Sequence, residues 1–133
     1  AARGVQYYAR AAGRPIVRAI DRVSSGAKGR RGEAAVRSVA DIGGKVPFMI
    51  QDRLRIPDGT TEGVLTEVKS VRRLAYTQQL RDYAAHAKLT RRRFELWVRP
   101  GRPGCPGTTL SEPLEAAVKR KDVILKYIPF TRR

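Results

Sequence analysis

The sequence predicts an α/β fold in a single domain, and three observations lead to this expectation. Helical and strand-like patterns alternate along the 133-residue chain in the order helix, three strands, helix, strand, helix, strand. The strand predicted over residues 64–71 carries apolar side chains on both faces, as a central strand covered by helices does. Hydrophobic residues make up 41% of a chain long enough for one domain with a core but too short for two.

The individual elements follow from periodicity and from capping residues. Apolar side chains at helical spacing predict helices over 33–40, 76–89 and 111–119, the last with Ser111 as its N-cap. Alternating or continuous apolar runs predict strands over 46–50, 53–56, 64–71, 94–98 and 123–128. The first two of these are either two strands or one bent strand, with the bend at Gln51 and Asp52.

Two helix faces can also be assigned. In the helix over 33–40 we expect a core face made of Ala35, Val36, Val39 and Ala40. In the helix over 76–89 the core stripe should be Leu80, Tyr83, Ala84 and Ala87, which leaves Gln79, Asp82 and His86 on another face.

The charge of the chain points to a polyanionic partner. Twenty-eight Lys and Arg residues against 12 Asp and Glu residues give a formal net charge of +16. Such an excess steers association with phosphates and gains from counterion release, so nucleic acid is the leading partner. A membrane surface is the rival, but no apolar run is long enough to span a bilayer. One Cys and one His exclude a disulfide framework and a His-based or thiolate metal site.

The stretch over residues 56–69, IPDGTTEGVLTEVK, carries the candidate chemistry. Glu67 and Lys69 stand two apart in a predicted strand and therefore share one face. The Gly- and Thr-rich turn before that strand folds it back, which brings Asp58 near Glu67. Two carboxylates held together favour a divalent cation, and hard oxygen ligands suit Mg²⁺. Beside them, Lys69 could act on water or stabilise transition-state charge, so this arrangement predicts phosphodiester hydrolysis.

Pro57 and Asp58, followed by Glu67, Val68 and Lys69, resemble the PD-(D/E)xK motif of restriction-endonuclease-like nucleases. Within that group, the region from Arg55 through Tyr83 and on to the FELWVRP run resembles the C-terminal nuclease toxin domains of bacterial polymorphic toxins. The resemblance implies a restriction-endonuclease-like fold with a mixed central sheet flanked by helices. It also implies two regions, an N-terminal helical segment or linker over 1–28 and the nuclease toxin domain over 29–133.

The resemblance extends the candidate site by two residues. Many of these nucleases place an acidic residue of the first helix at the metal, which makes Glu33 a third candidate ligand beside Asp58 and Glu67. The alternative for Glu33 is a favourable position in the first turn of a helix. Gln79 and Tyr83 resemble a QxxxY element in which the Gln holds substrate or water, with Gln78 or a merely exposed Gln as alternatives.

Two basic clusters are candidates for nucleic-acid binding. The first lies in the glycine-rich stretch over 24–32, which we expect to be a flexible connection preceded by helices over 5–12 and 15–23. The second is a run of three arginines at a turn, and both clusters could contact a phosphate backbone. Their members are Lys28, Arg30, Arg31, Arg91, Arg92 and Arg93.

The resemblance implies a DNase toxin that requires Mg²⁺, with Mn²⁺ as a substitute. Such a toxin is secreted or delivered from the producing bacterium, acts in the cytoplasm of a target cell, and is neutralised by a cognate immunity protein that we expect to be acidic. A tRNA-cleaving RNase of the same fold is one alternative. A non-catalytic basic nucleic-acid-binding module is the other, and the Asp58, Glu67 and Lys69 set argues against it.

Overall fold

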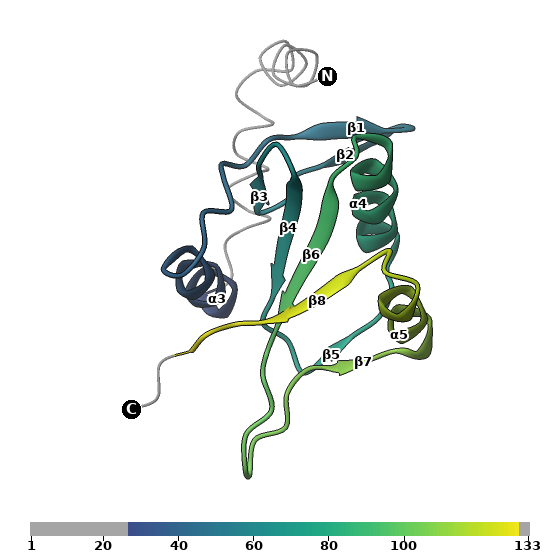
Figure 1. The fold of residues 1–133 in the computed structure, drawn as a ribbon. Helices are drawn as coiled ribbons and strands as arrows, with labels where there is room; N and C mark the ends of the chain where they lie inside the picture. The colour runs from purple at the N-terminus through teal and green to yellow at the C-terminus, as the bar shows by residue number, and fades with distance from the viewer. Residues whose placement is uncertain (1–26, 131–133) are drawn as a thin grey trace.

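The computed structural model describes residues 27–130, arranged as a mixed β-sheet between helices (Figure 1). The sheet contains four strands in the order β3-β4-β6-β8. Strand β3 (Gly59–Thr60) runs antiparallel to β4 (Val64–Lys69), whereas β4, β6 (Arg93–Val98) and β8 (Ile124–Tyr127) run parallel. The predicted α/β class and mixed sheet are therefore confirmed.

The helices cover the two faces of this sheet. Helix α4 (Gln78–Leu89) connects β4 to β6, helix α5 (Glu112–Lys119) connects β6 to β8, and both lie on one face. Helix α3 (Ala27–Arg37) lies on the other face. The larger core, between the sheet and α4 and α5, includes Leu65, Leu80, Tyr83, Phe94 and Leu114. The smaller core beneath α3 is formed by Val36, Ile42, Val68, Trp97 and Ile128.

Strand β4 has the double-sided burial that its sequence predicts. Its four residues from Leu65 to Val68 are all buried. Because side chains alternate along a strand, Leu65 joins the larger core and Val68 the smaller one. Phe94 and Trp97 of β6 divide between the two cores in the same way.

Capping residues fix where the later helices begin. The Thr77 hydroxyl accepts a hydrogen bond from the Leu80 N–H, which starts α4 two residues after its predicted beginning. Ser111 caps α5 through the Leu114 N–H, and Pro113 occupies the first turn. The prediction for Ser111 is confirmed.

Four short strands form two small sheets outside the central one. Strands β1 (Phe48–Ile50) and β2 (Arg53–Arg55) make an antiparallel hairpin, so the predicted pair is two strands with its turn at Gln51 and Asp52. Strands β5 (Arg73–Leu74) and β7 (Thr109–Leu110) pair in parallel. Two-residue strands carry no periodicity, which is why the sequence did not predict this second pair.

Helix α3 differs from its prediction at both ends. It begins at Ala27, so part of the stretch expected to be flexible is helical, and Glu33 lies in its middle rather than in its first turn. The helix ends at Arg37, and Val39 is consequently outside the helical repeat and 61% exposed instead of buried. Val36 is fully buried as expected.

Asp82 also differs, because it lies in the interior although it is off the core stripe. Its side chain is buried beneath the β1–β2 hairpin, where Arg53 and Arg55 neutralise it with N···O distances of 2.7 Å. His86, expected at the surface or rim, is half-buried with its ring stacked on Phe48 at 3.7 Å between centroids.

The expectations for the N-terminal segment and for a membrane span have different outcomes. The helices predicted over 5–12 and 15–23 lie outside the described residues, so the division at residue 28 stays a prediction. No helix among residues 27–130 combines the length and the apolar composition needed to cross a membrane.

Candidate active site

The candidate site lies at the edge of β4, just beyond the end of β3. Strand β3 pairs only Gly59 and Thr60 with Thr66 and Leu65. Asp58 therefore precedes the ladder and lies beside the second half of β4. The Asp58 N–H donates to Glu67 Oε1 at 3.1 Å, and the Val68 N–H donates to Asp58 Oδ2 at 2.8 Å. The turn thus brings Asp58 and Glu67 together as predicted.

Lys69 completes the predicted set. Its Nζ lies 3.2 Å from Glu67 Oε2, which agrees with the expectation that the two side chains share a face of the strand. The Lys69 side chain is 29% exposed, whereas that of Glu67 is 5% exposed. The ammonium therefore reaches solvent, where a substrate can approach, while the carboxylate stays inside.

Burial controls the charge of Glu67. Removal from water raises the pKa of this carboxyl, the nearby Asp58 charge raises it further, and Lys69 opposes both, with a resulting pKa of about 8. Without another cation, Glu67 therefore holds a proton at neutral pH.

Asp58 has the opposite behaviour. Burial by itself raises the pKa of Asp58, but the Val68 N–H and the Lys45 ammonium outweigh it and hold the pKa below its ordinary value. The two neighbouring carboxyls therefore differ in charge, with Asp58 ionised and Glu67 protonated near pH 7.

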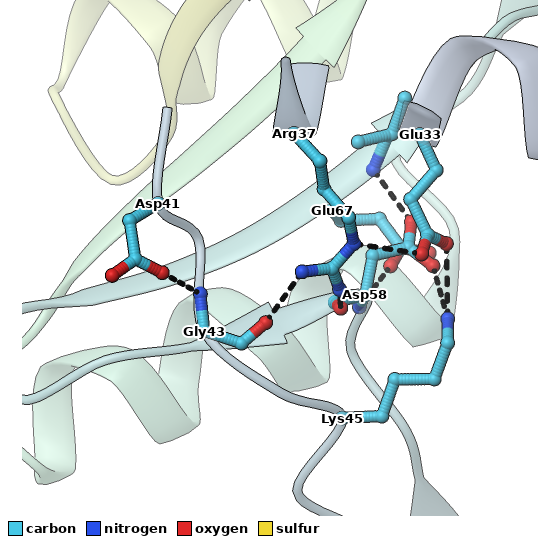
Figure 2. Close-up of polar contacts among 8 residues, drawn as sticks. Glu33, Arg37, Asp41, Gly43, Lys45, Asp58 and Glu67 are labelled. Atoms are coloured by element: carbon cyan, nitrogen blue, oxygen red, sulfur yellow. Dashed lines mark hydrogen bonds and ion pairs between the residues drawn. The ribbon is translucent and has the colours of Figure 1, made fainter. Parts of the chain in front are cut away.

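Lys45 is a member of the site that sequence reasoning missed. Its Nζ lies 3.0 Å from Glu33 Oε1 and 3.1 Å from Asp58 Oδ1, so one ammonium bridges two carboxylates (Figure 2). Although burial lowers the pKa of Lys45, the bonds to these two carboxylates keep it above its ordinary value. In a chain with 28 Lys and Arg residues, the only local signal was its position between a Gly-Gly pair and a predicted strand.

Arg37 holds the same region together from α3. Its guanidinium donates to Glu33 Oε2 at 3.1 Å and to the backbone carbonyls of Gly43 and Asp58, each at 2.8 Å (Figure 2). Gly43 has φ +77°, and a Cβ there would collide with the Thr60 carbonyl. This glycine therefore lets the 41–44 loop lie against β3, which places Lys45 beside Asp58.

Glu33 reaches the site as the resemblance implied, but its contacts there are with the side chains of Lys45 and Arg37. Both of its carboxylate oxygens accept bonds, one from Lys45 and the other from Arg37. Within residues 27–130 no group of three or more His, Cys, Asp or Glu side chains is arranged to hold a metal ion. The role of Glu33 as a metal ligand stays a prediction.

Gln79 makes no side-chain hydrogen bond to any residue of the described part of the chain. Gln78, the alternative, donates to Asp82 Oδ1 at 2.9 Å and so supports the hairpin rather than the site. Tyr83 is fully buried in the larger core. A role for Gln79 toward water or substrate stays a prediction.

The predicted basic clusters lie in different places. Arg30 and Arg31 are exposed on α3, and the side chain of Lys28 lies outside what the structure describes. Arg91 is exposed, whereas the Arg92 guanidinium donates to the Thr61 carbonyl at 2.7 Å. Arg93 pairs with Val64 at the start of β4, so this second cluster is at the other end of the strand from Lys69.

Comparison with known protein families identifies the fold independently of these contacts. Residues 29–114, well over half of the chain, match the sequence model of the family described as Restriction endonuclease fold toxin 7. The chain belongs to this family. It is accordingly a nuclease toxin domain with a restriction endonuclease fold, and the match contains Glu33, Asp58, Glu67, Lys69 and Gln79. Searches of curated proteins and of solved structures gave no significant match.

Proposed function

We propose that this restriction endonuclease fold toxin is a Mg²⁺-dependent endonuclease. Its active site for DNA cleavage would be formed by Asp58, Glu67 and Lys69. One observation carries the proposal. Three residues that sequence analysis assigned to phosphodiester hydrolysis converge at one edge of β4. Glu67 accepts a hydrogen bond from the Asp58 backbone N–H at 3.1 Å and pairs with the Lys69 ammonium at 3.2 Å. A purely structural pair has no need of a second carboxyl beside a buried one, since the two repel.

The donor chemistry of this site fits a divalent cation. Asp58 and Glu67 supply carboxylate oxygens, which Mg²⁺ prefers, and one or two carboxylates with water and substrate phosphate suffice for it. The Lys45 ammonium lies between Glu33 and Asp58, so Asp58 already carries a positive charge against one of its oxygens. A bound Mg²⁺ would supply Lewis-acid polarisation of the phosphate and a lowered pKa for water.

The residues of the chain have separate tasks in this proposal. Asp58 and Glu67 hold the cation, and Glu67 must first lose the proton that burial favours. Lys69, partly exposed next to Glu67, orients the attacking water or stabilises the charge that develops on the phosphoryl oxygens. Glu33 and Arg37 keep Lys45 and the Asp58 backbone in place.

The substrate, delivery and partner follow from charge and from family membership. A net charge of +16 supports binding to a nucleic acid backbone, and DNA is the substrate we infer for an antibacterial toxin of this fold. The toxin would be delivered from the producing bacterium and would act in the cytoplasm of the target cell. An immunity protein would protect the producer.

Incubation of the purified protein with plasmid DNA and with total RNA, each with and without Mg²⁺, tests the proposal. We expect cleavage of DNA that requires Mg²⁺ and is lost with chelator. Glu67→Gln and Lys69→Met should each reduce cleavage by at least about 100-fold, since residues that act as a unit lose most activity singly. Glu62→Gln is the matched control, because Glu62 is exposed in the adjoining turn and loses the same charge. If only RNA is cleaved, the substrate is RNA and the inference of DNA is wrong. If Glu67→Gln retains full activity, the assignment of the active site is wrong.

A further inference from the structure

The described structure contains a cavity lined by arginines on the opposite flank of α3 from the candidate active site. Its volume is about 500 Å³. Arg31 and Ala35 line it from α3, Ser70 from the end of β4, and Phe130 from the segment after β8. Arg99, Arg102 and Cys105 line it from the loop between β6 and β7, which extends beyond the sheet (Figure 1).

The charge of this cavity is entirely positive. Among residues 27–130, three guanidinium groups line it and no Asp or Glu does. Arg31 and Arg102 are exposed and form no ion pair with any residue of the described part of the chain. Arg99 is already oriented, because its guanidinium donates to the hydroxyl and to the carbonyl of Ser70 at 3.1 Å each. Like charges gathered without a carboxylate repel each other, and a bound anion relieves that repulsion.

The close packing of α3 on β4 puts this cavity near the catalytic residues. A Cβ on Gly32 would lie 3.3 Å from the Ser70 Cβ, so the absence of a side chain lets the helix approach the strand here. Gly32 and the buried Val36 face the sheet, Glu33 and Arg37 lie on one flank, and Arg31 and Ala35 lie on the other. The cavity therefore lies across α3 from Glu33 and beside Ser70, the residue that follows Lys69.

We propose that this cavity binds a backbone phosphate of the nucleic acid, on the same strand path as the bond that is cut. This inference rests on the proposed function, because it describes the path of the same substrate. Guanidinium groups match phosphate oxygens with two parallel N–H donors, which makes arginine better suited than lysine to such a site.

Binding measured without catalysis tests the proposal. Labelled duplex DNA, single-stranded DNA and duplex RNA are titrated with the intact protein in chelator, over a range of salt concentrations. Arg31→Gln/Arg102→Gln removes two exposed charges from the cavity. Lys119→Gln/Lys121→Gln removes two exposed charges from the end of α5, on the other face of the sheet, and is the matched control.

For duplex DNA we expect the cavity variant to reduce the slope of log affinity against log salt by about 0.9, since the cavity holds one phosphate and each phosphate contact contributes about 0.9. For single strands the expected reduction is about 0.7. The control should keep the slope of the unmodified protein. Arg31→Lys/Arg102→Lys should recover the slope, because the charges return, but with weaker binding because the guanidinium geometry is lost.

An unchanged slope in the cavity variant, or an equal fall in the control, would overturn the proposal. The two proposals fail in different ways. A protein that cleaves DNA while the cavity variant binds with an unchanged slope refutes only the arginine site. A protein that binds through the cavity but cleaves no nucleic acid refutes only the enzymatic function.

Discussion

The ionisation of each carboxyl at this site depends on the groups that surround it. Asp58 and Glu67 are both carboxyls beside β4, yet one has a pKa below its ordinary value and the other a pKa of about 8. Asp58 has the Lys45 ammonium and a backbone N–H on its oxygens, whereas burial dominates at Glu67. The site is thus prepared for one cation, and the second carboxylate becomes available only when its proton leaves.

The raised pKa of Glu67 predicts how stability depends on pH in metal-free protein. In the unfolded chain a Glu has a pKa of about 4.3, so between that value and about 8 the folded state binds more protons than the unfolded state. The free energy of unfolding should therefore fall as pH rises through this window and become level above it. Urea denaturation from pH 5 to pH 9 measures this.

Glu67→Gln should abolish that fall and should be more stable than the unmodified protein at pH 8 by more than about 1 kcal/mol, since one pKa unit corresponds to about 1.4 kcal/mol. Glu62→Gln, with its exposed side chain, should retain the fall. A Glu67→Gln protein with the same pH profile as the unmodified one would disprove the assignment of the shifted pKa to Glu67.

Lys45 leads to a second prediction at this scale. Without its ammonium, Glu33 and Asp58 would face each other with no cation between them. Lys45→Gln should therefore lower the stability of metal-free protein by about 1–2 kcal/mol, and it should enlarge the rise in melting temperature that Mg²⁺ produces. Thermal unfolding with and without Mg²⁺ measures both effects, and Lys119→Gln on exposed α5 is the control. An identical Mg²⁺ response would mean that Lys45 does not compete with the metal.

Among the elements, the β1–β2 hairpin is tied to α4 by one buried carboxylate. Asp82 accepts from Arg53, Arg55 and Gln78, and the bonds from Arg53 lower its pKa most. The hairpin leads directly into Asp58 through Ile56 and Pro57. An anchor on α4 therefore also fixes the direction in which the chain enters the candidate active site.

Asp82→Asn should destabilise the fold by about 2–4 kcal/mol, because two arginines lose the counterion that the buried Asp82 side chain supplies. Asp52→Asn, exposed in the turn of the same hairpin, is the control and should change stability by less than about 0.5 kcal/mol.

The pKa of Asp82 is depressed in the folded state, so this carboxylate stabilises the fold above the ordinary Asp pKa of about 3.9, and that stabilisation is lost as pH falls below it. Denaturation at pH 7 and at pH 3 should therefore show a smaller difference between Asp82→Asn and the unmodified protein at the lower pH.

The sequence predicted those elements whose residues repeat over several turns or pleats. Strand β4, helix α4, strand β6 and helix α5 were located within two residues, and the local turn was sufficient to bring Asp58 to Glu67. Helix α3 was predicted to begin too late because its glycines disfavour a helix. In the structure Gly32 is helical and packs closely on Ser70, where the lack of a side chain is an advantage. Lys45 and the partners of Asp82 depend on contacts between segments distant in sequence, and periodicity does not reveal such contacts.

At the scale of the whole molecule, the dominant property is a net charge of +16. A nuclease with this charge associates quickly with any nucleic acid, including that of the cell that makes it. The immunity protein proposed above would therefore have to bind before substrate does. Complementary charge speeds protein association, so we predict that the cognate immunity protein is acidic and that its association rate falls steeply with salt.

Such a partner has two ways to inhibit. It could cover Asp58, Glu67 and Lys69 directly, or it could bind beside them and block the basic path through Arg31 and Arg102. Coexpression of the protein encoded next to the toxin, followed by binding and cleavage assays, tests the prediction. If the partner covers the candidate site, Lys69→Met should weaken the complex, whereas Arg31→Gln/Arg102→Gln should mainly slow association. If the partner blocks the basic path, Arg31→Gln/Arg102→Gln should weaken the complex and Lys69→Met should have the smaller effect. A neighbour that is basic, or that binds without stopping cleavage, would contradict the immunity prediction while leaving the nuclease site intact, since the contacts among Asp58, Glu67 and Lys69 do not depend on a partner.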